Sequence, residues 1–77
     1  MNTKYESEYR QLGLKIAYYR KLRGITQEQL AEKIEQSAAF IAHVEAPNVD
    51  KAISLDTLFD ISEALDVPAH KFFIFED

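Results

Sequence analysis

The chain has 77 residues, a formal net charge of −4 and hydrophobic residues at 47% of its positions, so it can fill the modest core of one small domain. The absence of cysteine excludes disulfides and thiolate metal sites, and it gives no argument for secretion. No apolar run approaches the ~20 residues that cross a bilayer, and the N-terminus lacks the apolar region of a signal peptide. We therefore expect a single domain over residues 1–77, located in the cytoplasm.

Charge is distributed unevenly along the chain. Residues 1–44 carry seven Lys or Arg against five Asp or Glu, whereas residues 45–77 carry two against eight. A negative net charge opposes binding to DNA, because phosphate attraction supplies most of the non-specific affinity. A protein can nevertheless dock through a positive side while its acidic side faces away. The charge therefore predicts modest affinity for DNA and does not exclude it.

The first predicted helix lies between Thr3 and Gly24. Apolar residues spaced by three and four predict its buried face, which consists of Tyr5, Tyr9, Leu12, Ile16 and Tyr19. Thr3 and Glu6 are expected to form a capping box at its start, and Gly24 is expected to end it.

Two short helices are predicted next. Thr26 and Gln29 form a capping box for the second helix, whose inner residues are Leu30, Ala31 and Ile34. Ser37 is expected to cap the third helix, with Ile41 and Val44 pointing inward and Pro47 ending it. Only residues 35–37 separate the two helices, and so short a link forces the sharp crossing of a helix-turn-helix.

A fourth helix is predicted after the cap Ser54, with an inner face of Leu55, Leu58, Ile61 and Leu65. Pro68 suits the first turn of a short fifth helix. No single apolar face is large enough to be satisfied alone, so the sequence predicts an all-α, compact bundle of about five helices.

The ordered residues of this pattern resemble the Cro/phage-repressor (XRE) helix-turn-helix family. They are Leu12-Gly13, the run from Arg20 to Ala31, Ile41, Val44-Glu45 and residues 53–65. The resemblance covers roughly residues 12–73 and implies a lambda-repressor-like DNA-binding domain with its helix-turn-helix core at residues 26–46. It implies a sequence-specific transcriptional regulator that places its third helix in the major groove of double-stranded DNA, with repression as the expected action.

The resemblance also implies which residues bind DNA. Gln27 matches a position that holds a phosphate, and this is the role we expect; the alternative is a polar residue in a capped first turn without contact to DNA. Further phosphate contacts are expected from Arg23, Lys33, Asn48 and Lys51, with a solvated loop as the alternative for the last two. The outer face of the third helix is expected to meet the bases with Ala38, Ala39, Phe40, Ala42 and His43.

Several of these residues depart from the family pattern. Alanine cannot hydrogen-bond a base, so Ala38 and Ala39 favour contact with thymine methyl groups and reading of DNA shape. Phe40 can contact DNA, contact a protein or belong to the core, and His43 can donate to DNA or stand without a role. Glu35 occupies a turn position where relatives usually have glycine, which costs about 1–2 kcal/mol if the backbone is left-handed. Pro47 also stands where relatives often have glycine.

Two structural roles remain. Arg20 and Glu45 match a family pair that ties the first helix to the end of the third, which we interpret as a structural ion pair. The C-terminal segment 67–77 contains Phe72, Phe73 and Phe75 and is expected to form a homodimer interface, with the chain's own core as the alternative. A two-fold dimer would read a pseudo-palindromic DNA site.

Catalysis is not expected. His43 and His70 fall on different predicted helices without metal-ligand spacing, and no catalytic triad order or glycine-rich phosphate loop occurs. We expect no cofactor, no metal, no small-molecule ligand and no membrane partner.

The competing function is a helix-turn-helix domain that binds another protein, suggested by the apolar third helix and the negative net charge. Binding to DNA is favoured over binding to a protein by the polar and basic residues Gln27, Arg23, Lys21 and Lys33.

Overall fold

The computed structural model describes residues 4–46 and 52–75 of the chain. Its elements, in order, are α1 (Glu6–Leu22), α2 (Gln27–Lys33), α3 (Ala38–Glu45), α4 (Leu55–Leu65) and the 3-10 helix η1 (Ala69–Phe73). The predicted all-α class is therefore confirmed within these residues. The count of about five helices needs a small correction, because the last element is a 3-10 helix that Pro68 precedes as its N-cap.

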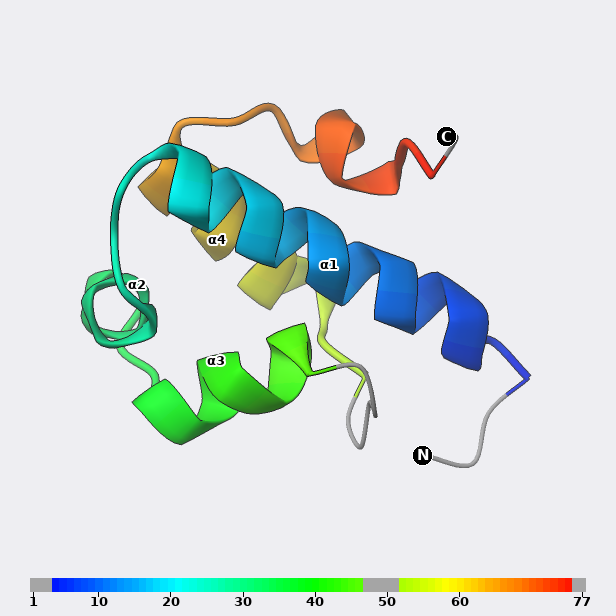
Figure 1. The fold of residues 1–77 in the computed structure, drawn as a ribbon, viewed down its shortest axis with the longest axis horizontal. Helices are drawn as coiled ribbons and strands as arrows, with labels where there is room; N and C mark the ends of the chain where they lie inside the picture. Colours follow the sequence, from blue (N-terminus) through cyan, green and yellow to red (C-terminus); the bar gives the residue numbers. More distant parts are fainter. Residues whose placement is uncertain (1–3, 47–51, 76–77) are drawn as a thin grey trace.

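The long helix α1 crosses the molecule, and the other elements pack around it (Figure 1). Helix α3 lies on one side of α1 and η1 on the other, while α4 lies behind α1 and contacts both α1 and α2. Their inward side chains form one core, made of Leu12, Ile16, Leu30, Ala31, Ile34, Ile41, Val44, Leu58, Ile61, Leu65, Val67 and Phe72. Every element contributes to this core, so no helix is stabilised by itself alone.

Side-chain caps fix where three of the helices begin. The Thr26 hydroxyl accepts from the Gln29 backbone N–H at 3.0 Å, and the Gln29 side chain accepts from the Thr26 N–H at 2.8 Å. Ser37 accepts from the Phe40 N–H at 3.0 Å, and Ser54 accepts from the Thr57 N–H at 3.1 Å. The three predicted N-caps are confirmed, and each satisfies a backbone donor that the helix leaves unpaired.

Helices α1, α2 and α4 all end with one residue of left-handed backbone. These residues are Gly24 (φ 73°), Glu35 (φ 58°) and Asp66 (φ 54°). After each helix, two backbone N–H groups bond back into its last turn; for α2 the Gln36 N–H donates to the Ala31 carbonyl at 2.9 Å and the Glu35 N–H to the Glu32 carbonyl at 3.3 Å. This is the Schellman arrangement, which favours glycine at the left-handed position. Only Gly24 meets that preference.

Helices α1 and α3 approach so closely that a side chain cannot fit between them. A Cβ atom built on Gly13 would collide with the backbone carbonyl oxygen of Val44. Glycine at this position therefore sets the distance between α1 and the C-terminal end of α3.

Some predictions about the buried faces are wrong. Tyr5 is the N-cap residue of α1 and 51% exposed, and Leu55 is the first residue of α4 and 62% exposed. Both lie at a helix end, where the helix extends past the core. The three- and four-residue spacing of apolar residues does not predict burial there. The start of α1 was also predicted wrongly, since its N-cap is Tyr5, which makes no side-chain cap. Thr3, with its predicted capping box, and Pro47 lie outside the described residues.

Replacing Glu35 by glycine should stabilise the protein, because glycine adopts a φ of 58° without the cost that a side chain incurs. We expect a gain of about 1 kcal/mol in the free energy of unfolding, measured by urea denaturation. The matched control is Glu32→Gly, inside α2, which should lose about 1 kcal/mol. A loss of stability from Glu35→Gly would contradict this account of the turn.

Candidate nucleic-acid interface

Helices α2 and α3 form the predicted helix-turn-helix. Helix α2 ends at Lys33 and α3 begins at Ala38, so the link comprises residues 34–37. Its first residue, Ile34, is buried in the core, and its last, Ser37, caps α3. The left-handed Glu35 between them turns the chain sharply. A core residue and two helix-end motifs thus fix the angle between the two helices.

Helix α3 has one anchored face and one free face. Ile41, Val44 and Glu45 are buried against the rest of the molecule. On the other side, Ala39 and His43 are exposed, and Ala38 and Ala42 are partly exposed. Phe40 is partly buried and packs against the core, so of its three possible roles the structure supports core packing. The free face therefore consists mainly of small apolar side chains with one histidine.

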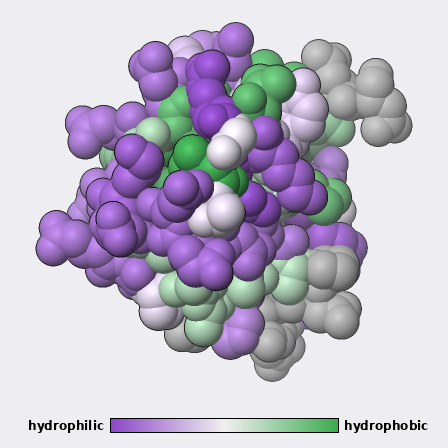
Figure 2. Space-filling view, turned by 60° about the vertical axis from the view of Figure 1, so that its left-hand side comes forward, coloured by the Kyte–Doolittle hydropathy of each residue, from purple (hydrophilic) through white to green (hydrophobic). Residues whose placement is uncertain are grey.

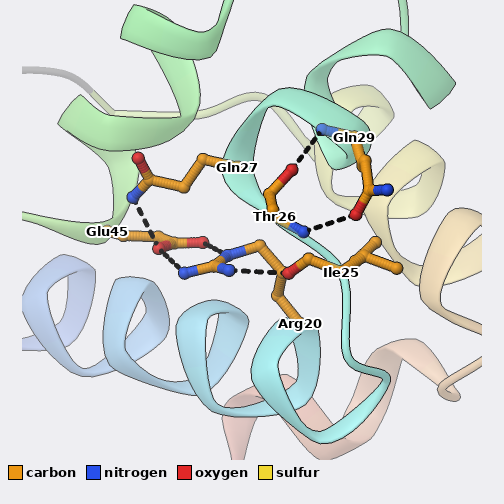
Figure 3. A network of polar contacts seen from close by, with 6 residues as sticks. All are labelled: Arg20, Ile25, Thr26, Gln27, Gln29 and Glu45. Atoms are coloured by element: carbon orange, nitrogen blue, oxygen red, sulfur yellow. Dashed lines mark hydrogen bonds and ion pairs between the residues drawn. The ribbon is translucent and has the colours of Figure 1, made fainter.

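A buried ion pair joins α1 to the end of α3 (Figure 3). The Arg20 Nε donates to Glu45 Oε2 at 2.7 Å, and the second guanidinium nitrogen donates to Glu45 Oε1 at 2.9 Å. The third nitrogen donates to the Ile25 carbonyl at 2.8 Å. Arg20 and Glu45 are 8% and 9% exposed. The hydrogen bonds with Glu45 raise the pKa of the Arg20 guanidinium despite the opposing effect of burial.

Gln27 belongs to the same network. Its side-chain Nε2 donates to Glu45 Oε1 at 3.0 Å, as Figure 3 shows. Gln27 is the first residue of α2, so the network ties all three helices together at one carboxylate. Sequence reasoning assigned Gln27 to phosphate and missed this bond. No local signal indicates it, because the two residues lie 18 positions apart.

The other predicted phosphate contacts lie in different surroundings. The Arg23 guanidinium donates to the carbonyls of Leu65 and Asp66 at 2.7 and 2.9 Å, so it caps the end of α4, a role that the sequence did not indicate. Lys33 is exposed at the end of α2 and borders a shallow hollow with acidic Glu35, Asp60 and Glu63. Asn48 and Lys51 lie outside the described residues. The predicted phosphate contacts all stay predictions; they are Gln27, Arg23, Lys33, Asn48 and Lys51.

The C-terminal aromatic residues do not act as one group. Phe72 is fully buried, and its ring contacts Tyr19 edge to face at 5.3 Å between ring centroids. The assignment of Phe72 to a dimer interface is therefore corrected: it belongs to the chain's own core. Phe73 is 48% exposed, and the partly buried Phe75 borders with it an apolar hollow of about 280 Å³ against the start of α1.

The face of the molecule that contains α2 is mostly hydrophilic, with smaller hydrophobic areas (Figure 2). Over residues 4–46 and 52–75, no group of His, Asp and Glu side chains could hold a metal ion. Within the same residues, no helix is both long and apolar enough to cross a membrane.

The fold and the α2–α3 unit define the chain as a helix-turn-helix protein. A family profile, HTH_3 (helix-turn-helix), matches residues 16–72, which is more than half of the chain. The chain therefore belongs to this family, of the Cro/phage-repressor (XRE) type, and is a DNA-binding regulator of transcription by class. Comparison with curated proteins gave no match.

A solved structure confirms the fold. The chain is similar to the restriction-modification controller protein C.AhdI from Aeromonas hydrophila, with a TM-score of 0.83 and 21% sequence identity. The match covers 92% of this chain and 100% of the controller protein. At this identity the likeness establishes the arrangement of helices and nothing about the DNA site.

The stabilising effects of Arg20 and Glu45 should depend on each other, because each residue neutralises the buried charge of the other. Arg20→Met and Glu45→Met should each lower the free energy of unfolding by about 3–5 kcal/mol, because each leaves one buried charge unpaired. The double variant should lose less than the sum, which a double-mutant cycle measured by urea denaturation will detect. Additive losses would mean that the two charges act independently.

Proposed function

We propose that this protein binds double-stranded DNA sequence-specifically, with α3 in the major groove, and represses transcription from the site it covers. The observation that supports this best is that the inner face of α3 is anchored in the core while its outer face is free. A major groove admits one α-helix, and the bases are read by the side chains on its outer surface. Ala38, Ala39 and Ala42 can contact thymine methyl groups, which favours an A·T-rich site.

Gln27 is compatible with a phosphate contact in spite of its bond to Glu45. A side-chain amide carries two N–H donors, and Glu45 accepts one of them. The second N–H is available to a phosphate oxygen, so one side chain would hold both α3 and the DNA backbone. This would fix the register of α3 on the duplex without reading any base.

The free face of α3 also supports the other class of function. Three alanines offer no hydrogen bond to a base, and a surface of this kind suits docking on a protein. The two functions differ in salt dependence, because phosphate binding releases counterions and weakens as salt increases.

The deciding experiment is selection from a random DNA pool at two salt concentrations, followed by binding measurements on variants. We expect enrichment of an A·T-rich pseudo-palindrome. His43→Glu should weaken binding by about 1–3 kcal/mol, since it places a negative charge on the free face of α3. The matched control is His70→Glu, an exposed histidine on η1, which should bind normally. No enrichment, with negligible retention at low salt, would assign α3 to a protein partner.

We also propose that the regulator is a homodimer that associates through the exposed part of the C-terminal segment. Phe73 is 48% and Ile74 41% exposed, and Phe73 borders the apolar hollow together with Phe75. A two-fold dimer would place two α3 helices about one DNA turn apart. Each half of a pseudo-palindrome would then meet one copy.

Replacing Phe73 by Ser should convert the dimer into a monomer, because it removes the most exposed ring of this surface. Light scattering at micromolar concentration measures the mass. The control is His70→Ser, which changes an exposed residue of the same 3-10 helix that does not border the hollow and should leave the dimer intact. A wild-type protein that is already monomeric would end the dimer proposal without affecting DNA binding by one copy.

A further inference from the structure

The outward side of α1 carries an apolar stripe that stays exposed in the structure of residues 4–46 and 52–75. Leu14, Tyr18 and Leu22 are 54%, 57% and 60% exposed. Their spacing of four residues places them one above another on a helix. The buried residues Leu12 and Ile16 lie on the opposite side of α1, so this stripe points directly away from the core.

Basic residues flank this stripe. Residues 9–27 contain no Asp or Glu. Arg20 and Arg23 of this stretch are bonded to Glu45 and to the end of α4, so the lysines remain beside the stripe. At 3.6 residues per turn, Lys15 lies along one edge of the stripe and Lys21 along the other. Lys21 is exposed, and the Lys15 ammonium lies 6.0 Å from the centre of the Tyr18 ring. We call Leu14, Lys15, Tyr18, Lys21 and Leu22 the α1 face; it is apolar and positively charged.

Helix α4 carries a face of the opposite charge. Leu55 and Phe59 are 62% and 52% exposed and lie one turn apart. Beside them on the helix surface lie the exposed carboxylates of Asp56, Asp60 and Glu63. Residues 52–67 contain no Lys or Arg, and the three carboxylates outnumber the one neighbouring base, Lys33 of α2, which borders the same hollow as Asp60 and Glu63. We call Leu55, Asp56, Phe59, Asp60 and Glu63 the α4 face; it is apolar and negatively charged, and so matches the α1 face in kind.

The two faces point away from each other on the molecule. Helix α4 lies behind α1 in Figure 1 and contacts it, and both helices direct their buried residues into the shared core. Their exposed sides are therefore on opposite sides of one chain. A two-fold contact uses the same patch on both copies, so it cannot join an α1 face to an α4 face in this arrangement.

We propose that the α1 face binds the α4 face of a second copy of this chain, head to tail. The apolar stripes of the two helices pack together, and the lysines beside one meet the carboxylates beside the other. Such a contact leaves one α1 face and one α4 face free at the ends of each assembly, so a third copy can add. This contact is separate from the two-fold dimer, and it would link neighbouring regulators into a row.

The test uses the full chain without DNA, so its result is independent of the proposed function. Sedimentation velocity over a range of concentrations measures the weight-average mass. We expect a mass that rises beyond two chains with concentration and falls with added salt, because the charged part of the contact is screened. A mass that stops at one or two chains at the highest concentrations overturns the proposal.

Charge reversal identifies the two faces. Variant A carries Lys15→Glu and Lys21→Glu, and variant B carries Asp56→Lys and Asp60→Lys. Each variant alone should associate at least ~10-fold more weakly than the wild type, since like charges then oppose across the contact. An equimolar mixture should recover association, because the reversed face of each variant complements the reversed face of the other. Recovery in the mixture also demonstrates that both variants are folded, and its absence overturns the assignment of these faces.

Discussion

The buried ion pair between Arg20 and Glu45 is the interaction on which the rest of the arrangement depends. A guanidinium and a carboxylate at 8% and 9% exposure are costly to bury, and the cost is offset only when their hydrogen bonds are satisfied. Here the carboxylate accepts from Arg20 and Gln27, and the guanidinium also donates to the Ile25 carbonyl. These bonds are directional, whereas hydrophobic packing is not. The pair therefore specifies where α3 lies in a way that the apolar core alone would not.

The sequence indicates the fold through local signals. The capping residues Thr26, Ser37 and Ser54 each precede an apolar period, and the structure confirms all three as N-caps. Burial was less well predicted at helix ends, as with Tyr5 and Leu55. The spacing of apolar residues indicates which side of a helix faces the core, but it does not indicate how far along the helix the neighbouring element extends. The 3-10 form of η1 was missed since five residues after a proline are too few for the period to distinguish helix types.

The candidate site likewise contains features that the sequence indicates and features that it does not. The pair Arg20–Glu45 and the outer position of Ala39 and His43 on α3 were accessible from the family resemblance. The bonds of Arg23 to the end of α4 and of Gln27 to Glu45 were not, because they join residues 42 and 18 positions apart that carry no mutual pattern. Phe72 and Phe73 are adjacent and chemically identical, yet one is fully buried and the other half-exposed. Only the path of the backbone decides between them.

The contact between Gly13 and the Val44 carbonyl lies at the C-terminal end of α3, beside Glu45, and makes that end of the helix a pivot. The opposite end is held by the turn at Glu35, whose backbone conformation is unfavourable for a residue with a side chain. Helix α3 has eight residues and is about 12 Å long at 1.5 Å per residue. A tilt of ~5° about the pivot would then move its first residues by ~1 Å. A change in the turn that tilted α3 would therefore displace Ala38 and Ala39 more than the buried Val44, which lies next to the pivot.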